Sequence, residues 1–216
     1  MNSILTPTRR DILYLASASK KRKELLHEAG IAFKLVNHIA DEKSCVWSGD
    51  LGSLTQKLAE LKMSHVHLPV GGIQNELCWV LTADTLTQAH GEIIGKPRDH
   101  QDAIAIIKNI RDGVDCSTGF CIERRIWDGS LWQTQERVTG SAHGWCSLAI
   151  ADDEIEPYFQ ALKKFSGFDY LKLAGAFSIT GYGAQFLKEV RGNYYAILGL
   201  PMAEVRAGLK KLNFSS

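Results

Sequence analysis

Apolar and polar positions divide the first third of the chain into short strand-like runs and longer helix-like stretches. Ile12 to Ala16 is a compact apolar run that predicts a strand, and an amphipathic helix-like segment follows it as far as Gly30. Ala32 to Val36 predicts a second strand, and Leu51 to His67 places apolar residues at helical spacing. This order of strand, helix, strand and helix is typical of an α/β protein.

The rest of the chain continues the pattern with longer strands. Leu77 to Thr82 is so apolar that it predicts a strand buried on both faces and paired in parallel. Further elements are expected in the order short strand, helix capped by Asp99, two long strands joined by an Asp-Gly turn, and two helices. The helix after Asp99 is expected to carry Ala103, Ile106, Ile107 and Ile110 on its apolar face, and the other predicted ranges are Glu92 to Gly95, Asp115 to Ile126, Gln133 to Ile150, Asp152 to Lys163 and Met202 to Leu212.

Composition narrows the class of protein without naming a function. With 216 residues, 45% of them hydrophobic, residues 1–216 are predicted to form one domain, its first ten or so residues an extension. The formal charge of +1 offers no general attraction to nucleic acid or to a membrane surface, and no apolar stretch approaches the ~20 residues that span a bilayer. The five cysteines lack zinc-ligand spacing, so we expect reduced, mostly buried thiols and a cytoplasmic protein.

The turn after the first strand combines features of a phosphate site. Ser17 and Ser19 stand in the turn, and four basic residues from Lys20 to Lys23 fill the first turn of the helix. Cations are normally unfavourable at a helix N-terminus, whereas free N–H groups, hydroxyls and cations together bind anions. A basic, solvated first turn is the alternative, and these residues alone leave both readings open.

Other charged residues in the chain are also open to both a functional and an ordinary structural interpretation. Asp84 follows the buried strand directly, where α/β proteins bind ligands, and a carboxylate there can hold Mg²⁺ or accept a proton. Strand-end aspartates are more often caps or turn formers. Glu42 can be a solvated loop acid, Lys62 can extend its stem over apolar residues with its ammonium in water, and Lys96 can be an ordinary lysine in a bend.

These motifs resemble, in unbroken order, those of the Maf family. LASASKKRKELL is similar to the family's S-x-S-P-R-R opening with a helix after it, and QKLAELKMSHV is similar to its R-L-A-x-x-K-A segment. Ala83-Asp84-Thr85 matches A-D-T, GEIIGKP matches G-E-I-x-G-K-P, and LAGAFSITGYGA with a later GLP resembles the family's C-terminal segment. The resemblance spans about Leu13 to Leu212.

The resemblance implies a fold and an activity. The fold is a mixed twisted sheet with flanking helices, in two lobes around a deep central cleft. The activity is hydrolysis of the α–β phosphoanhydride bond of nucleoside triphosphates, which yields a monophosphate and pyrophosphate and needs Mg²⁺ or Mn²⁺. A homodimer is also implied, and house-cleaning of non-standard nucleotides is a physiological role left open.

The resemblance also assigns roles residue by residue. Asp84 is the proton acceptor, Asp84 and Glu42 hold the metal, and Lys96 reaches the triphosphate. The catalytic set is therefore Asp84, Glu42 and Lys96. The substrate-binding set is Ser17, Ser19, Lys21, Arg22, Lys62, Thr85 and Thr180.

Three positions depart from the family pattern. Lys20 replaces a proline, and Lys21 replaces an arginine, which leaves Arg22 as the residue able to bind phosphate with a planar fork. Thr180 stands where relatives carry glutamine or glutamate, a position tied to base choice. Thr85 and the basic Lys21 match the members that act on dTTP and UTP, so these are the expected substrates, with the base left open.

Three other functions are alternatives to this one. A catalytically weak nucleotide-binding regulator of septum formation is the main alternative, although binding alone has no need of both Asp84 and Glu42. A dinucleotide-dependent oxidoreductase lacks its G-x-G-x-x-G after the first strand. A scaffold protein has no need of charged residues at strand ends.

Overall fold

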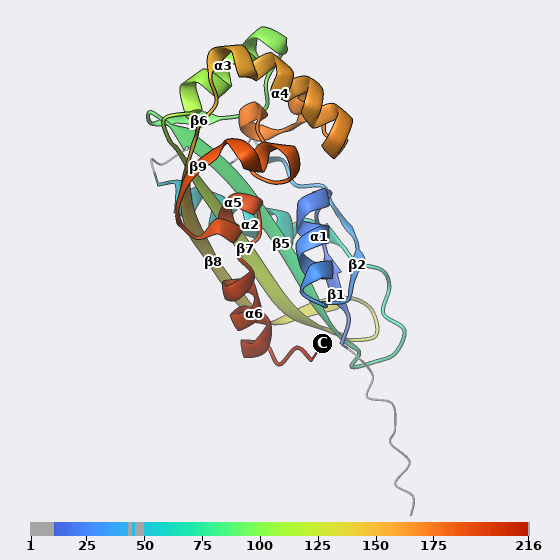
Figure 1. Cartoon of the computed structure of the whole chain (residues 1–216). Coiled ribbons are helices and arrows are strands. Elements are labelled where there is room, and N and C mark those ends of the chain that lie inside the picture. The colour runs from blue at the N-terminus through green and yellow to red at the C-terminus, as the bar shows by residue number, and fades with distance from the viewer. Residues whose placement is uncertain (1–10, 43–44, 46–49, 216) are drawn as a thin grey trace, which may run out of the picture.

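The computed structural model describes residues 11–42, 45 and 50–215. The predicted N-terminal extension and part of the predicted polar connection from Asn37 to Cys45 lie outside the described residues. Within them, a seven-stranded mixed sheet is flanked by helices, which confirms the predicted α/β class (Figure 1). No helix among the described residues is both long and apolar enough to cross a membrane.

The strands and helices follow one another in nearly the predicted order. The strands are β1 (Leu13–Leu15), β2 (Phe33–Leu35), β3 (Asn37–His38), β4 (Val66–His67), β5 (Leu77–Ala89), β6 (Glu92–Ile94), β7 (Val114–Trp127), β8 (Trp132–Leu148) and β9 (Leu187–Gly192). The helices are α1 (Lys20–Glu28), α2 (Leu51–Ser64), α3 (His100–Ile110), α4 (Ile155–Ala161), α5 (Tyr194–Leu198) and α6 (Met202–Lys211).

Strand β5 is the centre of the sheet, and it is longer than predicted. The strand order is β2-β1-β5-β7-β8-β9, with β5 parallel to β1 and antiparallel to β7, while β6 pairs with the far end of β5. The expected end of β5 at Thr82 is wrong, because β7 continues the ladder as far as Gln88. The apolar pattern stops earlier because residues 85–88 are only half-buried. Asp84 therefore lies within β5, just past the end of the parallel β1.

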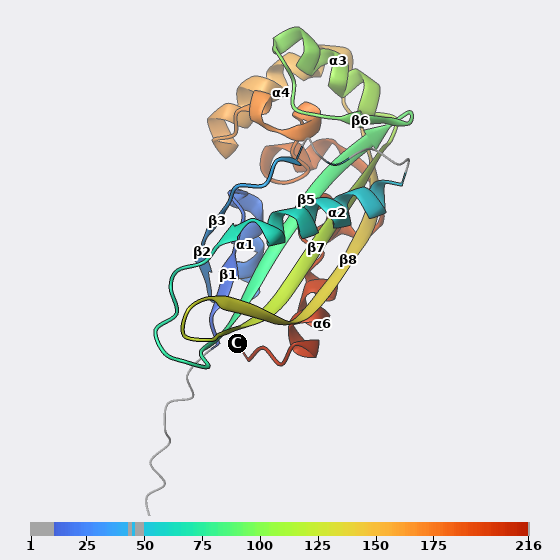
Figure 2. The same ribbon diagram turned by 180° about the vertical axis from the view of Figure 1, so that it is seen from behind.

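The two faces of the sheet are covered by different helices, which explains the continuous apolar run in β5. Trp79, Leu81 and Ala83 pack with α1 and α6, and the alternate residues Cys78 and Val80 pack with α2. Figure 1 shows α1 and α6 over one face, and Figure 2 shows α2 crossing the other.

One glycine lets α2 approach the sheet closely. A Cβ on Gly119 of β7 would lie 2.2 Å from the backbone carbon of Thr55 in α2. Any larger residue would push the helix away from the sheet, so this contact fixes the height of α2 above β5 and β7.

Helices α3 and α4 gather at the end of the sheet away from the C-terminal helix α6 (Figure 1), over a separate group of buried residues that includes Ile107, Tyr158 and Phe159. Asp99 caps α3 through the backbone N–H of Asp102, as predicted. The predicted hairpin is also confirmed, with β7 and β8 paired along most of their length.

Several boundaries differ from the prediction. The helix predicted to reach His67 ends at Ser64, because Val66 and His67 pair with β3 in a small second sheet. Neither Asp152 nor Asp153 caps α4. Asp152 forms ion pairs with Lys108 and Arg111, and residues 152–154 form a 3₁₀ turn. Strand β9 and helix α5 were not predicted.

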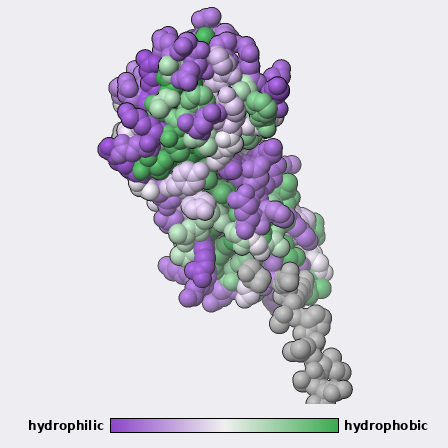
Figure 3. Space-filling model, viewed as in Figure 1, coloured by the Kyte–Doolittle hydropathy of each residue, from purple (hydrophilic) through white to green (hydrophobic). Residues whose placement is uncertain are grey.

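Hydrophilic residues cover most of the face seen in Figure 3, with apolar residues in smaller groups among them. All five cysteines are free, and four are buried while Cys45 is half-buried, which matches the expected reduced thiols. The deep cleft between two lobes and the single-domain assignment stay predictions.

Candidate functional site

The candidate site lies where the edge of β5 is open. On this edge β1 pairs with residues 79–81 and β6 with residues 87–89. Between them, no strand among the described residues pairs with this edge of the segment from Thr82 to Leu86, whose opposite edge is paired with β7. A sheet edge without a partner strand leaves backbone groups and side chains accessible to a ligand.

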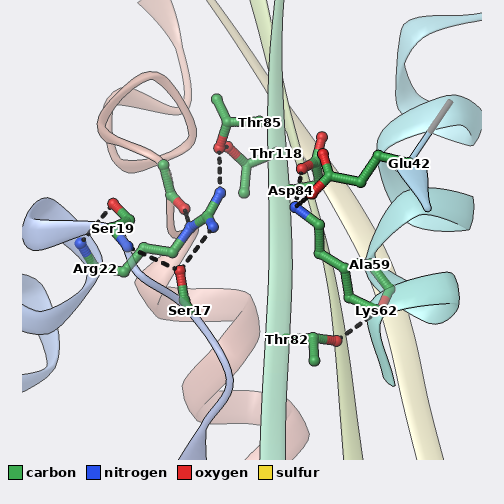
Figure 4. A network of polar contacts seen from close by, with 11 residues as sticks. Ser17, Ser19, Arg22, Glu42, Ala59, Lys62, Thr82, Asp84, Thr85 and Thr118 are labelled. Carbon is green, nitrogen blue, oxygen red and sulfur yellow. Dashed lines mark hydrogen bonds and ion pairs between the residues drawn. The ribbon is translucent and has the colours of Figure 1, made fainter. Parts of the chain in front are cut away.

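On the α2 face of this segment, one ammonium group meets two carboxylates. Lys62 projects from the last turns of α2 and donates a hydrogen bond to Asp84 Oδ1, and its Nζ lies 3.1 Å from Glu42 Oε1 (Figure 4). The side chains of Lys62 and Asp84 are only 8% and 9% exposed, whereas that of Glu42 is 49% exposed. Thr82 donates to the carbonyl of Ala59, which helps to hold α2 at this height.

This geometry has chemical consequences. Because Lys62 and Asp84 are both buried, their charges interact far more strongly than those of an exposed pair. Glu42 adds a second negative charge at the same ammonium. The carboxylates of Asp84 and Glu42 thus converge on a position that already holds a positive charge, and Asp84 presents an oxygen able to accept a proton.

On the opposite face of β5, Arg22 ties three segments together. Its Nε donates to the carbonyl of Gly199 at 2.7 Å, Nη1 to Ser17 Oγ at 3.0 Å and Nη2 to Thr85 Oγ1 at 2.9 Å. Figure 4 shows Arg22 and Thr85 on one side of β5, and Lys62, Glu42 and Asp84 on the other. Burial lowers the pKa of Arg22, while the charges of Asp84 and Glu42 act in the opposite direction.

Because residues that the structure describes accept three of the five guanidinium N–H bonds, two bonds of Arg22 have no acceptor among those residues and can be offered to a ligand. Gly199 comes close enough that a Cβ there would lie 3.4 Å from Thr85 Oγ1. Its φ of +104° is a conformation that favours glycine.

The Ser17–Ser19 turn leads directly into α1. Ser19 caps the helix by accepting the N–H of Arg22 at 3.4 Å, and Ser17 Oγ accepts the N–H of Ser19 at 3.3 Å. No described residue accepts the backbone N–H groups of Lys20 and Lys21. Such free donors at a helix N-terminus favour an anion. The ammonium of Lys21 pairs with Glu24 at 3.3 Å.

Two predicted site residues are not joined to this cluster. Lys96 is exposed in the bend after β6, and within the described part of the chain its ammonium makes no hydrogen bond or ion pair. Thr180 contacts Ser178, 3.3 Å between their hydroxyl oxygens, in the segment before a 3₁₀ turn at Gly181–Phe186. Their roles at the substrate stay predictions.

Sequence reasoning gave no role to three residues that the structure brings to the site. Thr118 contacts Thr85 at 2.8 Å, and Gly199 accepts from Arg22. His38 lies on β3 near Lys62, and its buried Nδ1 has no hydrogen-bond partner among the described residues. Burial, and then the charge of Lys62, lower the pKa of His38. Two of the three stood within segments that resemble family motifs and so offered a signal: Gly199 opens the GLP, and Thr118 belongs to the Thr-Gly that ends VDCSTG, Val114 to Gly119.

A preformed metal centre of three or more protein ligands is not found among the described residues. Two hollows of about 420 and 460 Å³ lie elsewhere, one at the start of α2 and the other between Ala29 and α6, and neither is lined by Asp84, Lys62 or Arg22. The cluster, rather than either hollow, combines the open strand edge with buried charged groups.

Comparisons with known proteins agree with this picture. The family profile described as "Maf-like protein" matches residues 12–212. The "dTTP/UTP pyrophosphatase" of Acholeplasma laidlawii is 32% identical over 204 residues, which cover 94% of this chain and 97% of the relative. The protein of the same name from Clostridium kluyveri is 33% identical and covers 88% and 92%. The "Nucleoside triphosphate pyrophosphatase" of Chlamydia pneumoniae is 31% identical and covers 93% and 94%.

Proposed function

The chain belongs to the Maf family, and on this premise we propose that it is a nucleoside triphosphate pyrophosphatase. It hydrolyses the bond between the α- and β-phosphates and releases a nucleoside monophosphate and pyrophosphate. The observation that carries the proposal is the buried ion pair of Lys62 with Asp84 at the open edge of β5, where Glu42 contacts the same ammonium group. The names of the relatives support dTTP and UTP as its substrates.

In the proposed reaction, Asp84 accepts the proton of the attacking water as the new oxygen–phosphorus bond forms and the bond to the bridging oxygen breaks. Positioned charges supply most of the catalysis in such phosphoanhydride cleavage, because little covalent chemistry is needed from the protein. Lys62 lies beside Asp84, so its ammonium is available to stabilise charge on the phosphate oxygens.

A divalent cation, Mg²⁺ or Mn²⁺, fits the donors at this position. Magnesium sites in phosphate-cleaving enzymes typically use one or two carboxylates and complete their shell with water and substrate oxygens. Asp84 and Glu42 offer such a pair, already gathered around a positive group. When bound, the cation would offset the charge of the polyphosphate and acidify water.

The phosphates would be held from the α1 face. Three kinds of donor support this part of the proposal: the hydroxyls of Ser17 and Ser19, and the N–H groups at the start of α1 and on Arg22 that no described residue accepts. Lys21, Lys96 and Thr180 are included on the resemblance to the family. Of these, Lys96 would have to approach the substrate as a mobile point charge.

We also propose a cytoplasmic homodimer that removes non-standard nucleotides as one of its roles. The free thiols suit a reducing compartment. The homodimer and the role in house-cleaning rest on the family resemblance alone.

The test is a product analysis with purified protein and Mg²⁺ or Mn²⁺, using dTTP, UTP, CTP, ATP and modified nucleotides. We expect pyrophosphate and monophosphate in equal amounts, fastest from dTTP and UTP. Reaction in H₂¹⁸O adds the label to one of the two products and so identifies the attacked phosphorus. Tight triphosphate binding without pyrophosphate release would instead favour the regulatory alternative, and release of orthophosphate would contradict the proposed bond cleavage.

A further inference from the structure

A directed chain of hydrogen bonds crosses the sheet beside the candidate site. Arg22 Nη2 lies 2.9 Å from Thr85 Oγ1, Thr85 Oγ1 lies 2.8 Å from Thr118 Oγ1, and Thr118 Oγ1 lies 2.6 Å from the carbonyl oxygen of Ala196 (Figure 4 shows the first three residues). Thr118 is fully buried.

The direction of every bond in this chain is determined by its ends. A carbonyl oxygen only accepts hydrogen bonds, so Thr118 donates its one hydroxyl proton to the carbonyl oxygen of Ala196. The bond between the two threonines must then be donated by Thr85. A guanidinium only donates, so Arg22 occupies one lone pair of Thr85. Within the part of the chain that the structure describes, Thr85 is left with a single free lone pair and no free proton.

The chain is also held in place at both ends. Thr85 and Thr118 are direct cross-strand partners in the ladder of β5 and β7. Ala196 belongs to α5, whose N-terminus is capped by Asn193 through the N–H of the same Ala196 at 3.0 Å. Arg22 is fixed by Gly199, the residue that ends α5. The hydroxyl of Thr85 therefore has little freedom to turn.

We propose that Thr118 is a positioning residue that fixes the Thr85 hydroxyl as a hydrogen-bond acceptor and so selects for uracil and thymine bases. This inference rests on the proposed function, which brings a nucleotide to the site. The N3–H of uracil and thymine is a donor, whereas N3 of cytosine carries a lone pair. Cytosine at Thr85 would therefore set two acceptors against each other, an arrangement that polar sites reject strongly.

The test compares UTP with CTP in variants of the full chain. Thr118→Val keeps the shape but cannot accept a proton from Thr85, so the Thr85 hydroxyl becomes free to donate to cytosine. The preference for UTP, as a ratio of kcat/KM values, should fall by about ten-fold, mainly through KM. Thr118→Ser restores the acceptor and should keep the wild-type preference.

A matched control is available on the other face of β7. Thr55 is also fully buried, and its Oγ1 contacts the hydroxyl of Ser117 at 3.1 Å. Thr55→Val loses a similar hydroxyl contact, so it should change stability without changing the UTP preference. Should Thr118→Val fold poorly, Thr85→Val leaves the bond from Thr118 to Ala196 intact and should lose the preference as well.

The outcomes separate this inference from the proposed function. Calorimetric binding of UMP and CMP to the same proteins reports the base preference without turnover. An unchanged preference in Thr118→Val or Thr85→Val, or equal binding of UMP and CMP by the wild type, would overturn the role of Thr118. Failure of the wild type to release pyrophosphate from any triphosphate would instead overturn the proposed function.

Discussion

Lys62 and Asp84 form a buried ion pair, and we predict that replacing Lys62 costs more unfolding free energy than replacing Asp84. Lys62→Met leaves the Asp84 carboxylate buried without its cation, and removing one partner of a buried pair costs about 3–5 kcal/mol of unfolding free energy. Asp84→Asn keeps a carbonyl oxygen for Lys62, and Lys62 keeps Glu42 at 3.1 Å. The ion pair then becomes a hydrogen bond from the ammonium to a neutral amide oxygen, at a cost of about 1–1.5 kcal/mol.

The double variant Lys62→Met/Asp84→Asn should be more stable than the sum of the single effects predicts, by about 2 kcal/mol, because it removes both charges of the pair and leaves neither one buried alone. The measurement is urea unfolding of all four proteins. For a protein of this size, Lys62→Met should lower Tm by about 6–20 °C. Lys108→Met is the matched control, since Lys108 pairs with Asp152 at 2.7 Å while both side chains are about half exposed.

We expect the control to lose less than about 1 kcal/mol. Two results would refute the reasoning. One is a cost for Asp84→Asn that exceeds that for Lys62→Met, and the other is strict additivity in the double variant. Either would mean that the unfolding free energy does not reflect a buried charge pair at this position.

The remaining predictions concern packing, pH and thiol chemistry. Gly119→Ala should lower the unfolding free energy by about 3 kcal/mol or more, because its Cβ would overlap the backbone of α2. Gly95→Ala has open space around the new Cβ and should lower it by less than about 1 kcal/mol. Equal unfolding free energies for the two variants would contradict this. The pKa of His38 is lower in the folded protein than in the unfolded chain. The contribution of neutral His38 to the unfolding free energy is therefore complete above about pH 6.5 and is lost as the pH falls further. His38→Asn should therefore flatten the decline of unfolding free energy as the pH falls below about 6.5, and an unchanged slope would count against the buried histidine. Burial raises the pKa of Cys78 and of Cys121 to about 12, so iodoacetamide should label half-buried Cys45 before either of them in the native protein. The labelling rates are measured by peptide mass spectrometry. Faster labelling of Cys78 or Cys121 than of Cys45 would contradict this prediction.

Local patterns predicted much of the fold because the features concerned are local. The cap at Asp99 and the hairpin of β7 and β8 depend on residues close together in sequence, and both are confirmed. The length of β5 could not be predicted in the same way. Its second half is polar and half-buried, and it remains a strand because β7 pairs with it.

The candidate site shows the same limit more sharply. The family motifs named Arg22, Lys62 and Asp84, and the structure brings them to the two faces of one strand segment. The partners that hold Arg22 come from distant segments, and Gly199 is 177 residues away. A local sequence pattern does not predict which residues of two strands pair. It therefore predicts neither the register that places Thr118 beside Thr85 nor the pairing of β3 with β4 that brings His38 near Lys62.

Asp84 is the residue proposed to carry out the chemistry at this site. The most direct test is the initial rate of pyrophosphate release from dTTP and UTP by Asp84→Asn, with folding checked by thermal unfolding. Asp115→Asn, which removes a carboxylate from the neighbouring strand β7, is the control. We predict that Asp84→Asn stays folded and loses at least about 10²-fold in kcat, the usual contribution of a general base, while Asp115→Asn keeps nearly full activity. A folded Asp84→Asn protein that releases pyrophosphate at close to the wild-type rate would contradict the account.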